Sequence, residues 1–408
     1  MQSKILLVLF IVPLLMISAC ANVSPRETVP ESEVTNAVVS GFPASIRFWA
    51  DEMPSNGVAI VQQRVKDYLA ANTEYFRLHQ KYPPLNYLAI SGGANKGAFG
   101  AGLLAGWTAR GNRPDFEMVT GVSTGALIAP FVFIGPKYDS KLQELYTMTN
   151  SSGIFHSSSF EVLKALTGGL SIAKSEPLAK KIEDNVTPDV IAEIAAEHRK
   201  GRRLYIGTTN VEAQRGVIWD IGAIANSGNP EAVHLIHQII LASASVPGLF
   251  PPVFIDVEAG GKRYSEMHAD GGVVSQVFAY PMKISREVVD AFLRYHLERH
   301  LYILRNNKSA AEYQRTPQDF YDLTNRSIET LTKYQGIGDL YRLYLTSQRD
   351  EIDYNLVFIP DSFTGKSKEM FDRDYMKSLF DLGYSIGNQQ SSPWLKKPPG
   401  LDYEPESN

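Results

Sequence analysis

The chain has 408 residues, of which 44% are hydrophobic and 21% are charged, and this balance is ordinary for a globular protein with a sizeable core. Its 40 basic and 44 acidic residues give a formal net charge of −4, and no long basic run occurs, so we expect no nucleic-acid partner. The length suits one large domain or two modest ones.

The N-terminus has the pattern of a secretory signal. Lys4 is followed by the apolar run ILLVLFIVPLLMI and then by SAC, and the run is too short to span a bilayer comfortably. The alternative, a single buried or anchoring helix, is disfavoured by that length and by Pro13. The end of the run, Ile17-Ser18-Ala19-Cys20, resembles the cleavage box of bacterial lipoproteins.

Residues 1–19 would then be a signal peptide, and Cys20 would be the lipid-modified first residue of the mature protein. Cys20 is the only cysteine, so it has no intramolecular disulfide to form. Several acyl chains on one terminus give stable anchoring, whereas a single chain gives only marginal binding. Ala21 stands where an Asp favours inner-membrane retention in the lipoproteins that this resembles. We therefore expect the outer membrane of a Gram-negative cell, facing the periplasm, with inner-membrane anchoring as the alternative.

Residues 20–56 are rich in Pro, Ser, Glu and Asn and predict a tether, with some order near IRFWA, and residues 57–84 predict an N-terminal helical segment. From Leu85, strand-like and helix-like runs alternate: strand 85–90, helix 97–110, strand 116–121, helix 124–134. This alternation predicts an α/β fold with a mainly parallel sheet and helices on both faces.

The later chain continues in mixed fashion. Residues 139–200 look mostly helical, RLYIGTTN and GVIWDIG look like strands, and PEAVHLIHQIILASAS looks like an apolar helix. Further on, LYILRNN and YNLVFIP predict strands, and 318–349 and 368–387 predict helices. We place a catalytic domain at 85–290 and a C-terminal α/β extension packed on it at 291–408. The boundary is weakly marked, and the later strands could instead extend the same sheet.

The string GVSTG, residues 121–125, stands at a strand-to-helix junction and fits a nucleophile elbow. The sharp turn would lift the hydroxyl of Ser123 clear of the sheet, and Gly121 and Gly125 remove side chains that would clash. The alternative is a serine that caps a helix behind a tight turn.

The stretch SGGANKGAFGAG, residues 91–102, brings five glycines between a strand and a helix. A phosphate loop would need Lys directly after Gly, whereas Lys96 precedes Gly97, and the order of a dinucleotide fingerprint is also absent. An oxyanion hole remains, in which the N–H groups at 92–95 hold a negative charge that exists only during the reaction. The four residues are Gly92, Gly93, Ala94 and Asn95. A helix-packing turn is the alternative.

An activated serine needs a base. His234 and His237 lie in an apolar helix and are expected to pack, and His296 and His300 are four apart in a run that predicts a solvated helix face. No third ligand accompanies that pair, so we expect no metal. Asp270, in HADGG, predicts a carboxylate presented on a tight turn, although a plain turn Asp has the same pattern.

These segments together resemble the patatin-like phospholipase family in the family's order. The matching parts are the loop Gly92-Gly93-Ala94-Asn95-Lys96-Gly97, the elbow around Ser123, and Asp270-Gly271-Gly272. The stretch ASASVPGLFPPV, residues 242–253, looks like a further block of the family. The resemblance covers about 85–275 and implies a three-layer α/β/α fold and a Ser–Asp dyad, with no histidine, metal or cofactor. Ala94 stands where many members have a third glycine, and Ser91 where many have Asp.

The resemblance implies a lipid acyl hydrolase in which Ser123 attacks an ester and Asp270 takes the proton. Lys96 would support the loop or attract a head-group phosphate, unless it is simply solvated. Two rivals stay open at this point. One is an α/β-hydrolase with a Ser-His-Asp triad that uses His296 or His300, and the other is a lipoprotein that binds lipid without catalysis. The sequence predicts a lipid substrate and a membrane anchor, but no oligomeric state.

Overall fold

The computed structural model describes residues 26–52, 57–148, 171, 174–279 and 297–401. The expected signal peptide, Cys20 and His296 lie outside these described residues.

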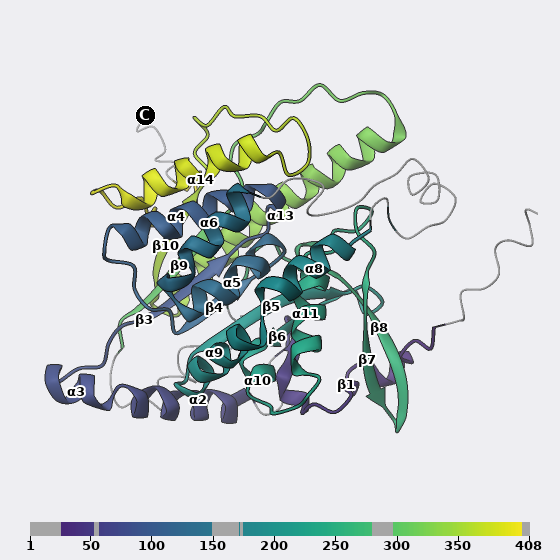
Figure 1. The fold of residues 1–408 in the computed structure, drawn as a ribbon, viewed down its shortest axis with the longest axis vertical. Coiled ribbons are helices and arrows are strands. Elements are labelled where there is room, and N and C mark those ends of the chain that lie inside the picture. Colours follow the sequence, from purple (N-terminus) through teal and green to yellow (C-terminus); the bar gives the residue numbers. More distant parts are fainter. Residues whose placement is uncertain (1–25, 53–56, 149–170, 172–173, 280–296, 402–408) are drawn as a thin grey trace, which may run out of the picture.

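A ten-stranded sheet runs through the molecule (Figure 1). Its main path follows the order β1 (Val38–Val39), β7 (Val253–Ala259), β8 (Lys262–Asp270), β5 (Arg203–Asn210), β4 (Met118–Gly121), β3 (Leu85–Ile90), β9 (Arg299–Arg305) and β10 (Asp353–Phe358). Beside this path, β6 (Arg215–Asp220) pairs with β5, and β2 (Arg47–Trp49) pairs with β6. Pairing is parallel from β5 through β4, β3 and β9 to β10, and antiparallel elsewhere. The expected α/β class with a parallel centre is confirmed.

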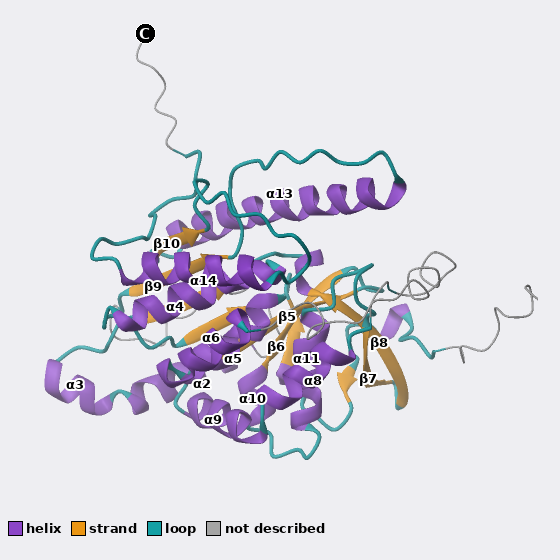
Figure 2. Ribbon diagram, turned by 45° about the horizontal axis from the view of Figure 1, so that its top comes forward, coloured by secondary structure: helices purple, strands orange, loops and turns teal. Residues whose placement is uncertain are grey.

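Helices cover both faces of the parallel strands (Figure 2). Successive side chains of a strand point to opposite faces, and in β3 Leu88 and Ile90 join one hydrophobic cluster while Tyr87 and Ala89 join the other. The first face carries α4 (Gly97–Ala109), α5 (Thr124–Ile134), α6 (Asp139–Thr147), α8 (Glu176–Asn185), α9 (Pro188–Arg199), α10 (Ile221–Ala225), α11 (Ala232–Ser243) and α14 (Arg373–Asn388). The second carries α2 (Gly57–Ala71) and α13 (Phe320–Arg349), and α3 (Thr73–His79) follows α2.

The central elements have the sequence character of interior segments. Every residue of β3 is buried, and α5, with the sequence TGALIAPFVFI, is buried around almost its whole circumference. A parallel strand covered on both faces reads as a continuous apolar run, and a helix that is apolar all round lies in the core. None of the helices in the described part of the chain is both long and apolar enough to cross a bilayer.

The N-terminal segment is more ordered than the expected tether, and the order expected near IRFWA is confirmed by β2. Within 26–52, β1 pairs with β7 and β2 pairs with β6, and Ile46 is only 1% exposed. Arg47 forms an ion pair with the buried Glu266 on β8. These strands have two and three residues, too few for an alternating pattern to be visible in the sequence.

The C-terminal region is part of the central sheet and not a separate extension packed on it. β9 pairs with β3 on the side opposite β4, and β10 pairs with β9. The strand that leads into the glycine loop is therefore flanked on one side by a segment more than 200 residues later in the chain.

Candidate active site

The proposed nucleophile lies on a strained turn. Ser123 follows β4, directly precedes α5, and has φ 55° and ψ −123°, a conformation rare for residues other than glycine. Its hydroxyl caps no N–H of α5, so the interpretation as an ordinary helix cap is wrong. A Cβ on Gly125 would lie 2.3 Å from the carbonyl oxygen of Ile90, so the turn is as tight as an elbow requires.

The Ser123 backbone is held from a neighbouring helix. Its N–H donates to Ser243 Oγ over 3.1 Å, and that hydroxyl donates to the Gly207 carbonyl over 2.7 Å. Ser243 is fully buried at the end of α11 and thus ties the elbow to β5. This contact offsets part of the strain at Ser123, because a hydrogen bond inside the protein fixes the conformation that the turn needs.

The structure brings Asp270 to Ser123. Asp270 ends β8 and is 5% exposed, and its Oδ1 accepts the Gly272 N–H over 2.7 Å. Its buried Oδ2 accepts no hydrogen bond of ordinary geometry from the described residues. Burial raises the pKa of Asp270 to about 7, while the nearby Ser123 hydroxyl and the Gly272 N–H act to lower it. A carboxylate with one free oxygen beside a serine hydroxyl is able to take its proton.

The glycine loop offers unengaged N–H groups next to this pair. Among the described residues, the N–H groups of Gly93, Ala94 and Asn95 donate to no partner.

Gly92 is different, because its N–H donates to the Gln276 carbonyl over 3.0 Å. Gly92 is therefore not an available oxyanion donor, contrary to expectation. A Cβ at this position would lie 3.2 Å from Ser123 Cβ, so the need for glycine here is one of space.

Ala94 and Gly93 both have positive φ. Ala94 has φ 49°, a left-handed conformation that is more costly for alanine than for the glycine that many patatin-like sequences have at this position. Gly93 has φ 156°, and a Cβ there would come 2.3 Å from the carbonyl oxygen of Asn306. Asn306 is fully buried after β9 and bonds both ends of the loop: its N–H and Nδ2 donate to Ser91, and its Oδ1 accepts from the Gly100 N–H.

The remaining motif residues have structural contacts. Lys96 Nζ donates to Asn307 Oδ1 over 3.0 Å, and burial lowers the pKa of this lysine, so it is not simply solvated. Five glycines share a lack of space, because a Cβ would come within 3.0 Å of a neighbouring atom: Gly97, Gly121, Gly125, Gly271 and Gly272.

Of the two histidines that could serve a triad, only His300 lies among the described residues, and it does not join the site. His300 lies at the start of β9, where its Nδ1 and Asp353 Oδ2 are 3.0 Å apart, and it is paired across the strands with Asn86. The expected helix around it is wrong. Ser123 follows the opposite, carboxyl end of these parallel strands, so His300 cannot serve it as a base.

His237 bonds the Val186 carbonyl. No group of His, Cys, Asp and Glu suited to a metal occurs among the described residues.

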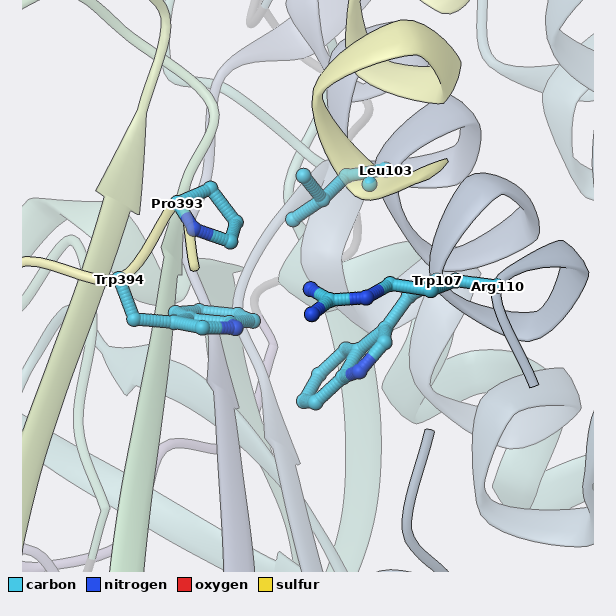
Figure 3. A pocket seen from close by; sticks show the side chains of 6 residues that line it. Leu103, Trp107, Arg110, Pro393 and Trp394 are labelled. Carbon is cyan, nitrogen blue, oxygen red and sulfur yellow. The ribbon is translucent and has the colours of Figure 1, made fainter. Parts of the chain in front are cut away.

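A small pocket lies elsewhere, at the far end of α4 (Figure 3). Trp107, Arg110 and Trp394 line it, and the two indole rings stand 4.8 Å apart between centroids. The glycine loop precedes the other end of α4, so this pocket is not part of the candidate site.

The family comparison agrees with the motifs. Residues 88–282 match the family model described as patatin-like phospholipase, a span that includes the glycine loop, Ser123 and Asp270. The chain thus carries a patatin-like phospholipase domain over these residues, as the sequence motifs indicated. No curated protein matches the chain. Among solved structures it is similar to VipD from Legionella pneumophila, with 14% identity and a TM-score of 0.35 over 74% of this chain and 68% of that one.

Three residues that contact the site were not foreseen: Ser243, Gln276 and Asn306. Asn306 and Ser243 did carry a signal, because Asn306 lies near the end of the predicted strand LYILRNN and Ser243 lies in the block ASASVPGLFPPV. Gln276 follows the Asp-Gly-Gly turn in a stretch with no pattern that singles it out.

Proposed function

We propose that the protein is a lipid acyl hydrolase, of the phospholipase A or lysophospholipase kind, in which Ser123 and Asp270 form a catalytic dyad. One observation carries this proposal: the free, buried Oδ2 of Asp270 lies beside a serine held on a strained elbow. The patatin-like phospholipase match supports a lipid ester as the substrate class.

In the proposed mechanism, Ser123 Oγ attacks the ester carbonyl as Asp270 Oδ2 takes the hydroxyl proton. A pKa of about 7 is well placed for this step, because a general base works best when its pKa is near the working pH. The N–H groups of Gly93 and Ala94 hold the oxyanion, and the N-terminus of α5 adds a favourable dipole. Asp270 then protonates the leaving alcohol, and water cleaves the acyl-enzyme.

The test uses purified protein, a fluorophosphonate probe and lipid-product profiling. Ser123→Ala should abolish labelling, and Ser123→Ala and Asp270→Asn should each lower ester hydrolysis by at least about 10³-fold. The double variant should be no worse than either, since the two residues act as one unit. His300→Ala, the control, should keep most activity. Wild-type protein that neither reacts with the probe nor releases fatty acid would favour the non-catalytic lipid-binding alternative.

We also propose that Cys20 carries lipid and anchors the protein to the outer membrane, on the strength of the signal-like segment before it. Cys20→Ala should move the protein from the membrane to the soluble fraction of a cell lysate. Cys20→Ala protein that stays with the membrane would contradict a lipid anchor at this residue.

A further inference from the structure

Gln276 joins the two halves of the candidate site. Its carbonyl accepts the Gly92 N–H of the glycine loop over 3.0 Å. Its own N–H donates to Asp339 Oδ2 over 2.7 Å, and Asp339 is a fully buried carboxylate of α13. The backbone of Gln276 is thus held from two sides, so its side chain begins from a fixed position.

The orientation of the Gln276 amide follows from its partners. Nε2 donates to the Gly272 carbonyl over 2.8 Å. A carbonyl oxygen only accepts, so the amide nitrogen must face Gly272, and Oε1 must point the other way. Gly272 is also the residue whose N–H donates to Asp270 Oδ1.

The amide oxygen of Gln276 and the Cβ of Ser123 both lie close to Gly92. A Cβ placed on Gly92 would be 3.2 Å from Gln276 Oε1 and 3.2 Å from Ser123 Cβ, so both atoms are close to the same point. No described residue donates to Oε1, although the rest of Gln276 is fully engaged. A fixed acceptor that receives no hydrogen bond from a described residue, near the proposed nucleophile, is suited to bind a small donor.

We propose that Gln276 Oε1 binds and orients the water that hydrolyses the acyl-enzyme. This inference rests on the proposed function. One O–H of the water donates to Oε1, and the other faces Asp270. The water oxygen forms a bond to the acyl carbon while Asp270 takes its second proton. The bond from that carbon to Ser123 Oγ then breaks, Asp270 returns the proton to Oγ, and the fatty acid leaves.

This role predicts a defect confined to the second half of the reaction. Gln276→Met keeps the length of the side chain and removes the acceptor. With a p-nitrophenyl ester of a fatty acid, the first-turnover burst should remain, and steady-state turnover should fall about 10²-fold. Intact-mass spectrometry should then show acylated Ser123 accumulating in the variant and not in the wild type.

A second variant separates the acceptor from the donor of the amide. Gln276→Glu retains an acceptor oxygen and loses the hydrogen bond to Gly272. Its acyl-enzyme, formed in a burst and then isolated, should hydrolyse faster than that of Gln276→Met. Gln63→Leu is the matched control, because Gln63 is exposed on α2 and, within the described part of the chain, its amide bonds only Asp67 on the same helix.

Three results would overturn the inference. Equal loss of burst and turnover in Gln276→Met, with slower fluorophosphonate labelling, would show that Gln276 merely positions the Asp270 turn. Equally slow deacylation in the Met and Glu variants would assign the effect to the donor. A normal burst with unaltered deacylation in both variants would show that Gln276 has no role in this step. If the wild type forms no acyl-enzyme on Ser123, by contrast, the proposed function itself fails.

Discussion

Burial of Asp270 has opposite consequences for catalysis and for stability. Removal from water disfavours the ionised carboxylate and raises its pKa from 3.8 to about 7. In the proposed mechanism the ionised form of Asp270 accepts the proton, so we expect activity to need a pH near or above that value. Between about pH 4 and 7 the folded protein holds a proton that the unfolded chain has lost. The contribution of this group to stability therefore falls as the pH rises through that window.

The pH dependence of activity and the pH dependence of stability test these two consequences of burying Asp270. The wild-type kcat/KM should rise with pH and level off above an inflection at about pH 7. Asp270→Asn cannot ionise, so its free energy of unfolding at pH 8 should exceed that of the wild type by up to about 4 kcal/mol, with little difference at pH 4. Urea unfolding at both pH values gives the comparison. An activity inflection near pH 4 would show that the base is not a buried carboxyl group.

The loop residues Gly93 and Ala94 offer adjacent changes with opposite expectations. Gly93→Val would place a Cβ against the Asn306 carbonyl and shift the neighbouring N–H groups, so kcat should fall about 10²-fold with KM nearly unchanged. Ala94→Gly relieves the positive φ of Ala94 and keeps its N–H, so it should retain kcat. Steady-state kinetics on one soluble ester give kcat and KM for both variants and for the wild type. Normal turnover by Gly93→Val would exclude this loop as the oxyanion hole.

At the scale of elements, part of the glycine run serves helix packing. A Cβ on Gly102 or Gly106 of α4 would come 2.0–2.1 Å from a backbone oxygen of α14. In the same way, a Cβ placed on Gly383 or Gly387 of α14 would come 2.1 or 2.2 Å from a backbone oxygen of α4. Each helix therefore presents two glycines four residues apart to the other, which lets the backbones touch. The helix-packing alternative is correct for Gly102, the last residue of SGGANKGAFGAG, and the unengaged N–H groups belong to the first half of that stretch.

This packing makes Gly383→Val strongly unfavourable. The added side chain has no room between the helices, and overpacking of this kind costs about 1–3 kcal/mol or more. Gly338→Ala on the exposed face of α13 is the matched control, because nothing lies within 4 Å of its Cβ position and alanine favours a helix. It should raise stability by about 0.4–1 kcal/mol. Thermal unfolding of the two variants should move in opposite directions.

The sequence predicted most elements because their periodic patterns are local. The runs at 85–90 and 124–134 coincide with β3 and α5, and the elbow and the Asp-Gly-Gly turn follow from residue types alone. It did not predict which strands pair, because pairing joins distant segments. His300 shows this limit of local patterns. The run RYHLERH looks helical, yet its last two residues, Arg299 and His300, begin β9, which pairs with β3 and ends beside the glycine loop. The engaged N–H of Gly92 likewise depends on Gln276, which no local pattern reveals.

At the scale of the whole molecule, the family match and the folded unit do not coincide. The match ends at residue 282, whereas β9, α13 and α14 follow it. These later elements contact the site directly. Asn306 bonds the glycine loop, and Asp339 bonds the turn that follows Asp270. The proposed catalytic residues and the elements that hold them thus come from both halves of the chain.

A chain that ends at residue 290 should therefore fail to fold. It keeps every motif of the family match but leaves β3, a fully buried strand, without its partner on one side. Unpaired backbone groups and exposed apolar surface are both costly, and the glycine loop also loses the hydrogen bonds of Asn306. Compared with the full chain, the shortened protein should show no cooperative thermal unfolding by circular dichroism and no fluorophosphonate labelling. A folded, labelled 290-residue chain would show that the matched region is an independent domain, as the sequence boundary first suggested.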